Sequence, residues 1–291
     1  MRHSFSSVLP ETDRIPLRAE LRAVTKVYPA RSGAVTALRD VSAGFRAGSF
    51  TAVMGPSGSG KSTLLQCAAG LDRPTSGQVL LAGQELGGLS EHRLTLLRRE
   101  SVGFIFQSFN LLPSLSAGQN VGLPLRLAGR RPRRSEVTAA LAAVGLADRA
   151  GHRPAELSGG QQQRVAIARA LITAPPVIFA DEPTGMLDSA SGREVLDLLR
   201  GLSDERHATV VMVTHDPAAA ARADRVIFLA DGQLAGELRD PTPSSVAARL
   251  AGLEQSGAQQ AGRPLAAARQ HTDLHHTDLH HTDLHHTGGA A

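Results

Sequence analysis

The chain has 291 residues, 42% of them hydrophobic, so it can bury a full core in one or two domains. Its 31 Lys and Arg residues outnumber its 27 Asp and Glu residues by too little to indicate nucleic-acid binding. The single cysteine, Cys67, excludes an internal disulfide, fits a reducing compartment and is expected to be a small buried residue. No run of about 18 apolar residues predicts a membrane span, and none follows Arg2 and His3 as in a secretory signal.

The N-terminal part of the chain is predicted to consist mainly of strands. Residues 1–18 are polar and irregular, so we expect a flexible lead there. Apolar patterning predicts strands over residues 20–28, 34–50, 49–54, 79–81 and 102–106. Helices are expected over residues 62–70 and 90–99, the second with Ser90 as its N-cap.

The middle of the chain has a different character. From about 117 to 150 it is rich in Ala, Leu and Arg, which predicts a helical subdomain, placed at about 108–165. This region contains a cluster of arginines, namely Arg130, Arg131, Arg133 and Arg134. The cluster indicates a solvated face or, alternatively, a surface that contacts a partner or lipid headgroups.

The C-terminal half alternates strands with helices, which indicates an α/β sheet that is mostly parallel. Strands are predicted over 177–180, 209–214 and 225–229, and helices over 161–173, 189–202 and 241–254. From Gln255 the sequence becomes rich in Gly, Gln and Ala and then repeats HTDLH three times, so residues 255–291 are expected to be disordered. The repeated histidines can bind Zn²⁺ or Ni²⁺ weakly, but a physiological metal site is the less favoured interpretation.

The segment GPSGSGKST contains the phosphate-binding pattern G-x-x-x-x-G-K-[ST]. Glycines have no Cβ, so they let such a loop curl and direct consecutive N–H groups inward, and the helix that follows adds the positive end of its dipole. A predicted strand before the loop and a predicted helix after it supply the context that the pattern requires. The residues expected to bind the phosphates are Gly55, Pro56, Ser57, Gly58, Ser59, Gly60, Lys61, Ser62 and Thr63.

Two side chains of this loop have specific expected tasks. Lys61 is expected to reach the β- and γ-phosphates, and the Ser62 hydroxyl to hold Mg²⁺. The chain has only two lysines, Lys26 and Lys61, so a lysine at the motif position is hard to attribute to chance. The alternative is a turn rich in Gly and Ser that happens to contain a lysine.

Two further motifs follow the phosphate loop, LSGGQQQR over 157–164 and VIFADEP over 177–183. With the three motifs in this order, residues 19–240 resemble the ATP-binding subunits of ABC transporters. The resemblance implies a P-loop NTPase fold of ABC ATPase type, in which an α/β core with a mostly parallel sheet carries an antiparallel β subdomain and a helical subdomain. It also implies ATP and Mg²⁺ as cofactors and ATP hydrolysis as the reaction.

The resemblance assigns roles to residues through their motifs. The expected aromatic platform for adenine is Tyr28, and the expected base that orients the attacking water is Glu182. Asp181 is expected to hold Mg²⁺ mostly through water, Gln107 to sense Mg²⁺ and the γ-phosphate, and His215 to contact the γ-phosphate.

In this family the LSGGQ segment binds the ATP held by the opposite subunit, so the resemblance implies a homodimer closed around two ATP molecules. The residues expected to act across that interface are Ser158, Gly159, Gly160, Gln161 and Asp188. As in the phosphate loop, small residues and the N–H groups at a helix N-terminus are expected to bind the γ-phosphate.

Several segments, among them LDRPTSGQVLLAG and LSGGQQQRVAIARAL, look most similar to the lipoprotein-release and macrolide-export group. This implies an ATPase peripheral to the cytoplasmic face of the cell membrane that drives a transmembrane permease, as an exporter or as an extractor of lipoproteins or peptides. Two positions depart from the family pattern, since Met186 stands where Asn is usual and Gln119 where Glu is usual.

Two other functions are alternatives at this stage. Related ATPases drive shape change in a regulatory membrane complex without transporting a substrate. DNA-repair and chromosome ATPases share LSGGQ but carry a long coiled coil before it, whereas residues 62–157 form a short interval without sustained heptads.

Overall fold

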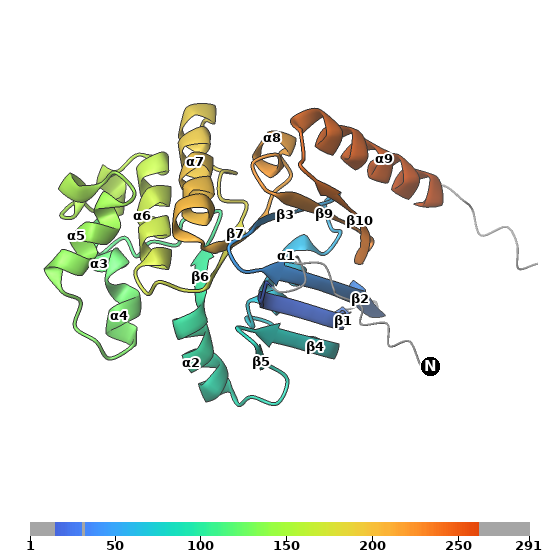
Figure 1. Cartoon of the computed structure of the whole chain (residues 1–291), viewed down its shortest axis with the longest axis horizontal. Coiled ribbons are helices and arrows are strands. Elements are labelled where there is room, and N and C mark those ends of the chain that lie inside the picture. The colour runs from blue at the N-terminus through green and yellow to red at the C-terminus, as the bar shows by residue number, and fades with distance from the viewer. Residues whose placement is uncertain (1–14, 31–32, 262–291) are drawn as a thin grey trace, which may run out of the picture.

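The structure is a computed structural model that describes residues 15–30 and 33–261 (Figure 1). Most of the expected flexible lead and all of the HTDLH repeats lie outside these residues. Within the described ranges, every helix is too short or too polar to cross a lipid bilayer.

A six-stranded sheet forms the centre of the fold. Its strands are β3 (Phe50–Met54), β6 (Val102–Ile105), β7 (Val177–Asp181), β8 (Thr209–Val213), β9 (Arg225–Ala230) and β10 (Gln233–Arg239). They lie in the order β10-β9-β3-β8-β7-β6, and every neighbouring pair is parallel except β9 with β10. β3 and β8 are buried along their whole length, as is typical of strands covered on both faces.

A second sheet is antiparallel and has the strand order β2-β1-β4-β5. Its strands are β1 (Leu17–Ala30), β2 (Gly33–Arg46), β4 (Ser76–Leu81) and β5 (Gln84–Glu85). β1 begins at Leu17, so it includes the last residues of the expected lead. The strand predicted over 34–50 is confirmed as far as Arg46 but ends there, because Gly48 adopts a φ of 68° and the chain turns between β2 and β3.

Two apolar clusters cover the two faces of the six-stranded sheet. Val53 of β3 belongs to the cluster shared with the antiparallel sheet and with α1 (Lys61–Ala68). Its neighbours Ala52 and Met54 belong to the other cluster, because alternate residues of a strand point to opposite faces. This other cluster is completed by α6 (Gly159–Leu171), α7 (Ser189–Arg206) and α9 (Pro243–Ala261). Figure 1 shows α1 between the two sheets.

Helices dominate the middle of the chain. They are α2 (Glu91–Ser101), α3 (Ala117–Val121), α4 (Leu123–Leu127), α5 (Arg134–Ala142) and α6 (Gly159–Leu171). Ser90 is the N-cap of α2 and accepts the N–H of Arg93, as predicted. α3, α4 and α5 lie together at one end of the molecule (Figure 1). Their entry loop is fixed by the buried Asn120 amide, which bonds backbone groups of residues 112–116.

The last helices are α7 (Ser189–Arg206), α8 (Pro217–Ala220) and α9 (Pro243–Ala261). The sequence did not predict α8 or β10. It also predicted α9 too short, since the helix continues to Ala261 into the segment expected to be disordered. Val246 is fully buried and joins α9 to the apolar core.

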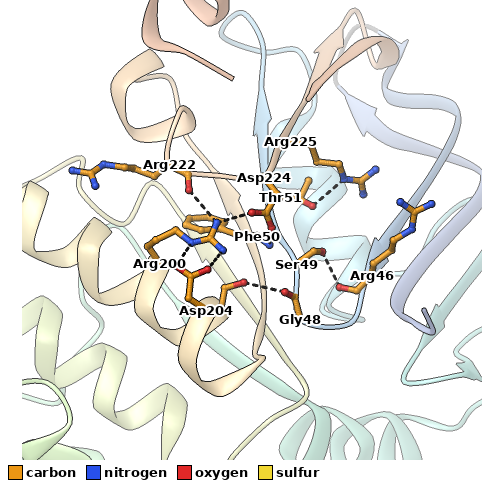
Figure 2. A network of polar contacts seen from close by, with 11 residues as sticks. Arg46, Gly48, Ser49, Phe50, Thr51, Arg200, Asp204, Arg222, Asp224 and Arg225 are labelled. Atoms are coloured by element: carbon orange, nitrogen blue, oxygen red, sulfur yellow. Dashed lines mark hydrogen bonds and ion pairs between the residues drawn. The ribbon is translucent and has the colours of Figure 1, made fainter. Parts of the chain in front are cut away.

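A polar network joins α7 to the starts of β3 and β9 (Figure 2). The Arg200 guanidinium donates to the Asp224 carboxylate over 2.8 Å, and the same carboxylate accepts the backbone N–H of Phe50 over 2.7 Å. Arg200 also pairs with Asp204 and lies 5.6 Å from the centre of the Phe50 ring. The network therefore holds α7 against the strand that leads to the phosphate loop.

Candidate functional site

The expected site residues gather at one edge of the six-stranded sheet. β3, β6, β7 and β8 all end at this edge, because neighbouring parallel strands have their carboxyl ends on the same side. The phosphate loop follows β3, Gln107 follows β6, Glu182 follows β7 and His215 follows β8. Parallel topology thus brings together groups that are far apart in the sequence.

The phosphate loop fits closely against its neighbours at two glycines. A Cβ at Gly55 would overlap the carbonyl oxygen of Leu229, and a Cβ at Gly60 would overlap that of Ala37. Gly60 also has a φ of 98°, a conformation that is costly for other residues. Only glycine fits at both positions, so the loop keeps a curled backbone that a ligand can approach closely.

Helix α1 begins directly after this loop. Its N-cap, Gly60, makes no side-chain hydrogen bond, so the first N–H groups and the positive end of the dipole are available to an anion. Lys61 Nζ donates to the carbonyl oxygens of Gly55 over 2.9 Å and Pro56 over 2.8 Å, and burial lowers the pKa of this ammonium. Phosphate oxygens are stronger acceptors than these carbonyls, so the loop fits a polyphosphate.

Ser62 and Asp181 meet beside the phosphate loop. Ser62 Oγ donates to Asp181 Oδ1 over 3.2 Å. Burial raises the pKa of Asp181, and the hydrogen bond from Ser62 opposes this shift. Hydroxyl and carboxylate oxygens are ligands that Mg²⁺ prefers, and a cation here would offset the cost of burying the carboxylate. The pair therefore fits the expected metal.

Glu182 and His215 are in direct contact. His215 Nδ1 lies 2.9 Å from Glu182 Oε2, with 16% of the Glu182 side chain and 70% of the His215 side chain exposed. Glu182 has a φ of 48°, which is uncommon for a residue with a side chain, and its N–H donates to the Val213 carbonyl over 2.9 Å. A backbone held in such a conformation is typical of functional sites and fixes the direction of the carboxylate.

Gln107 lies against the loop that follows Glu182. Its Nε2 is 2.7 Å from the place that a Cβ on Gly185 would occupy. The Gly185 N–H in turn donates to the Glu182 carbonyl over 3.0 Å. The glycine therefore allows the exposed amide of Gln107 to lie beside the segment that carries Glu182.

The LSGGQ segment forms the N-terminus of α6, which begins at Gly159 and thus earlier than predicted. Ser158 is the N-cap: its Oγ accepts the Gln161 N–H over 3.3 Å, and its N–H donates to Gln161 Oε1 over 2.9 Å. Gly160 packs on the start of α7, where a Cβ would lie 2.8 Å from Ser191 Oγ. A small residue is thus required at Gly160, whereas a Cβ on Gly159 would meet Leu187 and Phe109 only at ordinary contact distances of 3.6 and 3.8 Å.

Asp188 caps α7. Its carboxylate accepts the N–H groups of Ala190 and Ser191 over 2.9 and 3.0 Å and the Ser191 hydroxyl over 2.7 Å. The hydrogen bonds from Ser191 above all lower the pKa of Asp188. In residues 15–30 and 33–261, no hydrogen bond joins Asp188 or the LSGGQ segment to the phosphate loop.

Tyr28, the expected adenine platform, is half-buried near the end of β1. Its hydroxyl donates to Asp72 Oδ2 over 2.6 Å, and Lys26 Nζ lies 4.8 Å from the centre of its ring. The sequence did not predict either neighbour.

A second residue that the sequence did not single out is Gln163, which is fully buried in α6. Its Nε2 donates to the Pro183 carbonyl over 2.6 Å and to the Phe106 carbonyl over 3.4 Å, while its buried Oε1 has no partner. Gln163 thus links α6 to the loops after β7 and β6. The only signal in the sequence is a polar residue one turn before the core residue Ile167.

The chain is similar to known proteins over most of its length. A profile of the ABC transporter family matches residues 38–185. The chain is 43% identical to MJ0796, a bacterial ABC transporter cassette of known dimeric structure, with a TM-score of 0.70 and coverage of 77% of this chain and 99% of that chain. The chain belongs to the ABC transporter family. A further structure of MJ0796, in a dimeric post-hydrolysis state bound to ADP and Pi, gives a TM-score of 0.71.

This membership confirms the expected fold of an ABC ATPase and the expected ATP hydrolysis. Curated relatives are more similar in sequence. The chain is 51% identical over 235 residues to the macrolide export ATP-binding/permease protein MacB of Rhodopseudomonas palustris (strain HaA2) and 50% identical over 224 residues to that of Burkholderia pseudomallei (strain K96243). The matches cover 80% and 76% of this chain but 35% and 34% of the relatives, so the chain spans about a third of their length.

Proposed function

We propose that this chain is the ATPase of an ABC exporter, which closes as a dimer around two Mg²⁺-ATP and drives a permease from the cytoplasmic face of the membrane. The observation that carries the proposal is the meeting of the phosphate loop, the Ser62–Asp181 pair and the Glu182–His215 pair at one sheet edge. The relatives support export, since each is a macrolide export ATP-binding/permease protein. The cargo that fits this similarity is a macrolide or, as the sequence also suggests, a lipoprotein or peptide.

Glu182 is the proposed base. Its carboxylate is nearly enclosed and is held by a fixed backbone, so it can orient a water for in-line attack on the γ-phosphate. Lys61 and the first amides of α1 would stabilise the charge that develops on the phosphate oxygens. His215 contacts the base and is exposed enough to reach the γ-phosphate as well.

Ser62 and Asp181 are the proposed metal ligands, and Gln107, which follows the neighbouring strand β6, is the third residue assigned to the metal. When bound, Mg²⁺ supplies charge neutralisation to the phosphates. Because the carboxylate of Asp181 must be ionised to bind the cation, its raised pKa predicts weaker metal binding in acid than an ordinary aspartate would show.

We infer the dimer from the LSGGQ segment, which, in the part of the chain that the structure describes, is not hydrogen-bonded to the chain's own phosphate loop. Ser158, Gly159 and Gly160 lie at a helix N-terminus. Within the described residues, no hydrogen bond joins them to the chain's own phosphate loop, so we assign them to the ATP of a second copy. The dimeric structures of MJ0796 support this arrangement.

An apolar groove offers the permease a docking surface. It has a volume of about 610 Å³ and lies between α2 and β6 on one side and α4 and α6 on the other. Its lining includes Phe104, Phe106 and Leu127, the last 70% exposed. Phe106 directly precedes Gln107, so a permease segment in the groove would reach the loop that carries this glutamine.

Glu182→Gln tests the assignment of the base. The variant keeps the shape of the side chain but cannot take a proton, so hydrolysis should fall by about a hundredfold or more while ATP still binds. The measurements are phosphate release and light scattering after size exclusion with Mg²⁺-ATP, where a stable dimer is expected. Glu205→Gln, on the exposed side of α7, is the matched control and should behave as wild type. Wild-type turnover in Glu182→Gln would refute the assignment.

Transport itself requires the permease. Vesicles that contain the chain together with its permease should move a macrolide or lipopeptide only with ATP. ATP hydrolysis that reshapes the complex without moving any cargo would favour the regulatory alternative instead.

A further inference from the structure

Three side chains, those of Lys26, Tyr28 and Asp72, are joined by contacts at the end of β1. Lys26 and Tyr28 stand two residues apart on one strand and therefore on the same face. Lys26 Nζ donates to Asp72 Oδ1 over 2.5 Å and to the Arg73 carbonyl over 2.7 Å, and it lies 4.8 Å from the centre of the Tyr28 ring. The second oxygen of Asp72 accepts the Tyr28 hydroxyl over 2.6 Å.

This set is more firmly held than a surface ion pair. Only 12% of the Lys26 side chain and 28% of the Asp72 side chain are exposed. The backbone around it is fixed as well, because the Val27 N–H donates to Thr75 Oγ1 over 3.0 Å. Screening by water is correspondingly weaker than for an exposed pair.

The charges of the set are defined at neutral pH. Burial acts to raise the pKa of Asp72, but the hydrogen bonds from Lys26 and Tyr28 outweigh it, and the net pKa is lowered. The pKa of Tyr28 is raised, first by burial and then by its bond to Asp72. An ionised carboxylate thus holds an ammonium with one oxygen and a protonated phenol with the other.

We propose that Lys26 and Asp72 are positioning residues that orient the Tyr28 ring for adenine. Lys26 covers one face of the ring, Asp72 fixes its hydroxyl, and the base stacks on the opposite face. An aromatic ring that is already held in place loses less freedom when the base binds, so affinity for the base rises. The inference rests on the proposed ATP site but concerns the base alone, because neither residue belongs to the phosphate loop.

The chain itself supplies the reporter. Tyr28 is the only tyrosine and the chain has no tryptophan, so tyrosine absorbance and emission of the full chain report on this ring alone. Binding of Mg²⁺-ATP is compared with binding of Mg²⁺-tripolyphosphate, which has no base, in wild type, Lys26→Met and Asp72→Asn. Base–aromatic stacking contributes about tenfold or more to affinity. We expect each variant to weaken ATP by about three- to tenfold and to leave tripolyphosphate unchanged.

A spectroscopic titration separates positioning from a general structural role. In Asp72→Asn the pKa of the phenol should fall, because its charged acceptor is gone, and tyrosinate should appear at lower pH than in wild type. Arg22→Met, which removes an exposed cation from the same strand, is the matched control and should change neither ligand. Asp72→Asn keeps a hydrogen-bond acceptor, so it still reports if Lys26→Met does not fold.

Two results would overturn the inference: ATP affinity equal to wild type in both variants, or an equal loss for ATP and tripolyphosphate. Tyr28→Ala distinguishes the positioning role of Lys26 and Asp72 from the proposal that Tyr28 binds adenine. If Tyr28→Ala weakens ATP while the two variants do not, only the positioning role fails. If Tyr28→Ala binds ATP as wild type does, the adenine platform itself is wrong.

Discussion

At the scale of single residues, the phosphate loop depends on where side chains are missing. Gly58 and Gly60 both have left-handed φ values, 77° and 98°. A Cβ at Gly58 would meet open space, whereas one at Gly60 would overlap the Ala37 carbonyl. The pattern G-x-x-x-x-G-K requires glycine at 55 and 60 but not at 58, and the two required positions are the ones that the fold crowds.

This difference predicts unequal effects of the same substitution. Gly58→Ala should cost about 1 kcal/mol, which is the strain of the backbone alone, and Gly60→Ala about 3 kcal/mol or more, because the Ala37 carbonyl must also move. Denaturant unfolding of both variants without nucleotide measures the two costs. Equal costs would contradict the crowding seen at Gly60.

Cys67 leads to a prediction for alkaline pH. Burial raises the pKa of its thiol to about 12, whereas an unfolded cysteine titrates near about 8.5. The folded-state pKa is the higher one, so the contribution to stability is full below about 8.5 and is lost as the pH rises toward about 12. The free energy of unfolding should therefore fall more steeply in wild type than in Cys67→Ala over this window. Thiol reagents should modify the native chain only slowly.

The sequence could identify the site residues that belong to motifs. Lys61, Asp181 and Glu182 were named from the sequence, and the structure brings them to one edge, although their roles remain proposals. Lys26 and Gln163 could not be named in this way. Their importance comes from contacts with Asp72 and Pro183 across gaps in the sequence that no local pattern reports.

At the scale of elements, α6 connects the LSGGQ segment to the loops that follow β6 and β7. Gln163 lies one turn into the helix and bonds the carbonyls of Pro183 and Phe106. Any shift of the helix end is therefore passed to the segments next to Glu182 and Gln107. This gives the proposed interface between two copies a direct connection to the proposed base, Glu182.

Gln163→Leu tests this connection. Leucine has a similar size and removes the unpaired Oε1 together with both hydrogen bonds, so the variant should still fold. A misplaced base should lower kcat by about ten- to a hundredfold and leave KM for ATP nearly unchanged, because the phosphate loop is not touched. Gln162→Leu, which loses only a bond to the Leu157 carbonyl, is the control in the same ATPase assay. Parallel losses in both variants would argue against a specific link.

Elements were predictable where their apolar pattern was strong. The buried strands β3, β7 and β8 came within a residue of their predicted bounds, because strands covered on both faces read as apolar runs. β10 was missed since its pattern is weak, with Gly236 at a φ of 136° and most side chains exposed. α8 spans only Pro217–Ala220, too few residues to show helical periodicity.

At the scale of the whole molecule, one carboxylate joins segments from three parts of the chain. Asp224 accepts the N–H of the buried Phe50 and pairs with Arg200 of α7 (Figure 2). The two contacts differ in how much they contribute to the stability of the fold. The ion pair is half-exposed and contributes little, whereas a buried N–H without a partner is costly.

Two substitutions separate these contacts. Asp224→Asn keeps an acceptor for the Phe50 N–H and loses only the ion pair, so it should cost less than about 1 kcal/mol. Asp224→Ala leaves that N–H unpaired and should cost about 2–3 kcal/mol. Thermal or denaturant unfolding gives both numbers. Equal losses for Asn and Ala would show that the ion pair, which both variants lose, matters more than the backbone bond.

Helix α7 has 18 residues and is thus about 27 Å long. Near the N-terminus of α7, Ser191 packs against Gly160 of α6. Further along the helix, Arg200 contacts Asp224 beside the start of β3. Ser191 and Arg200 are nine residues apart, about 14 Å along this one continuous helix. In the proposed dimer, a displacement of α6 at Gly160 would therefore reach the strand before the phosphate loop through a single helix.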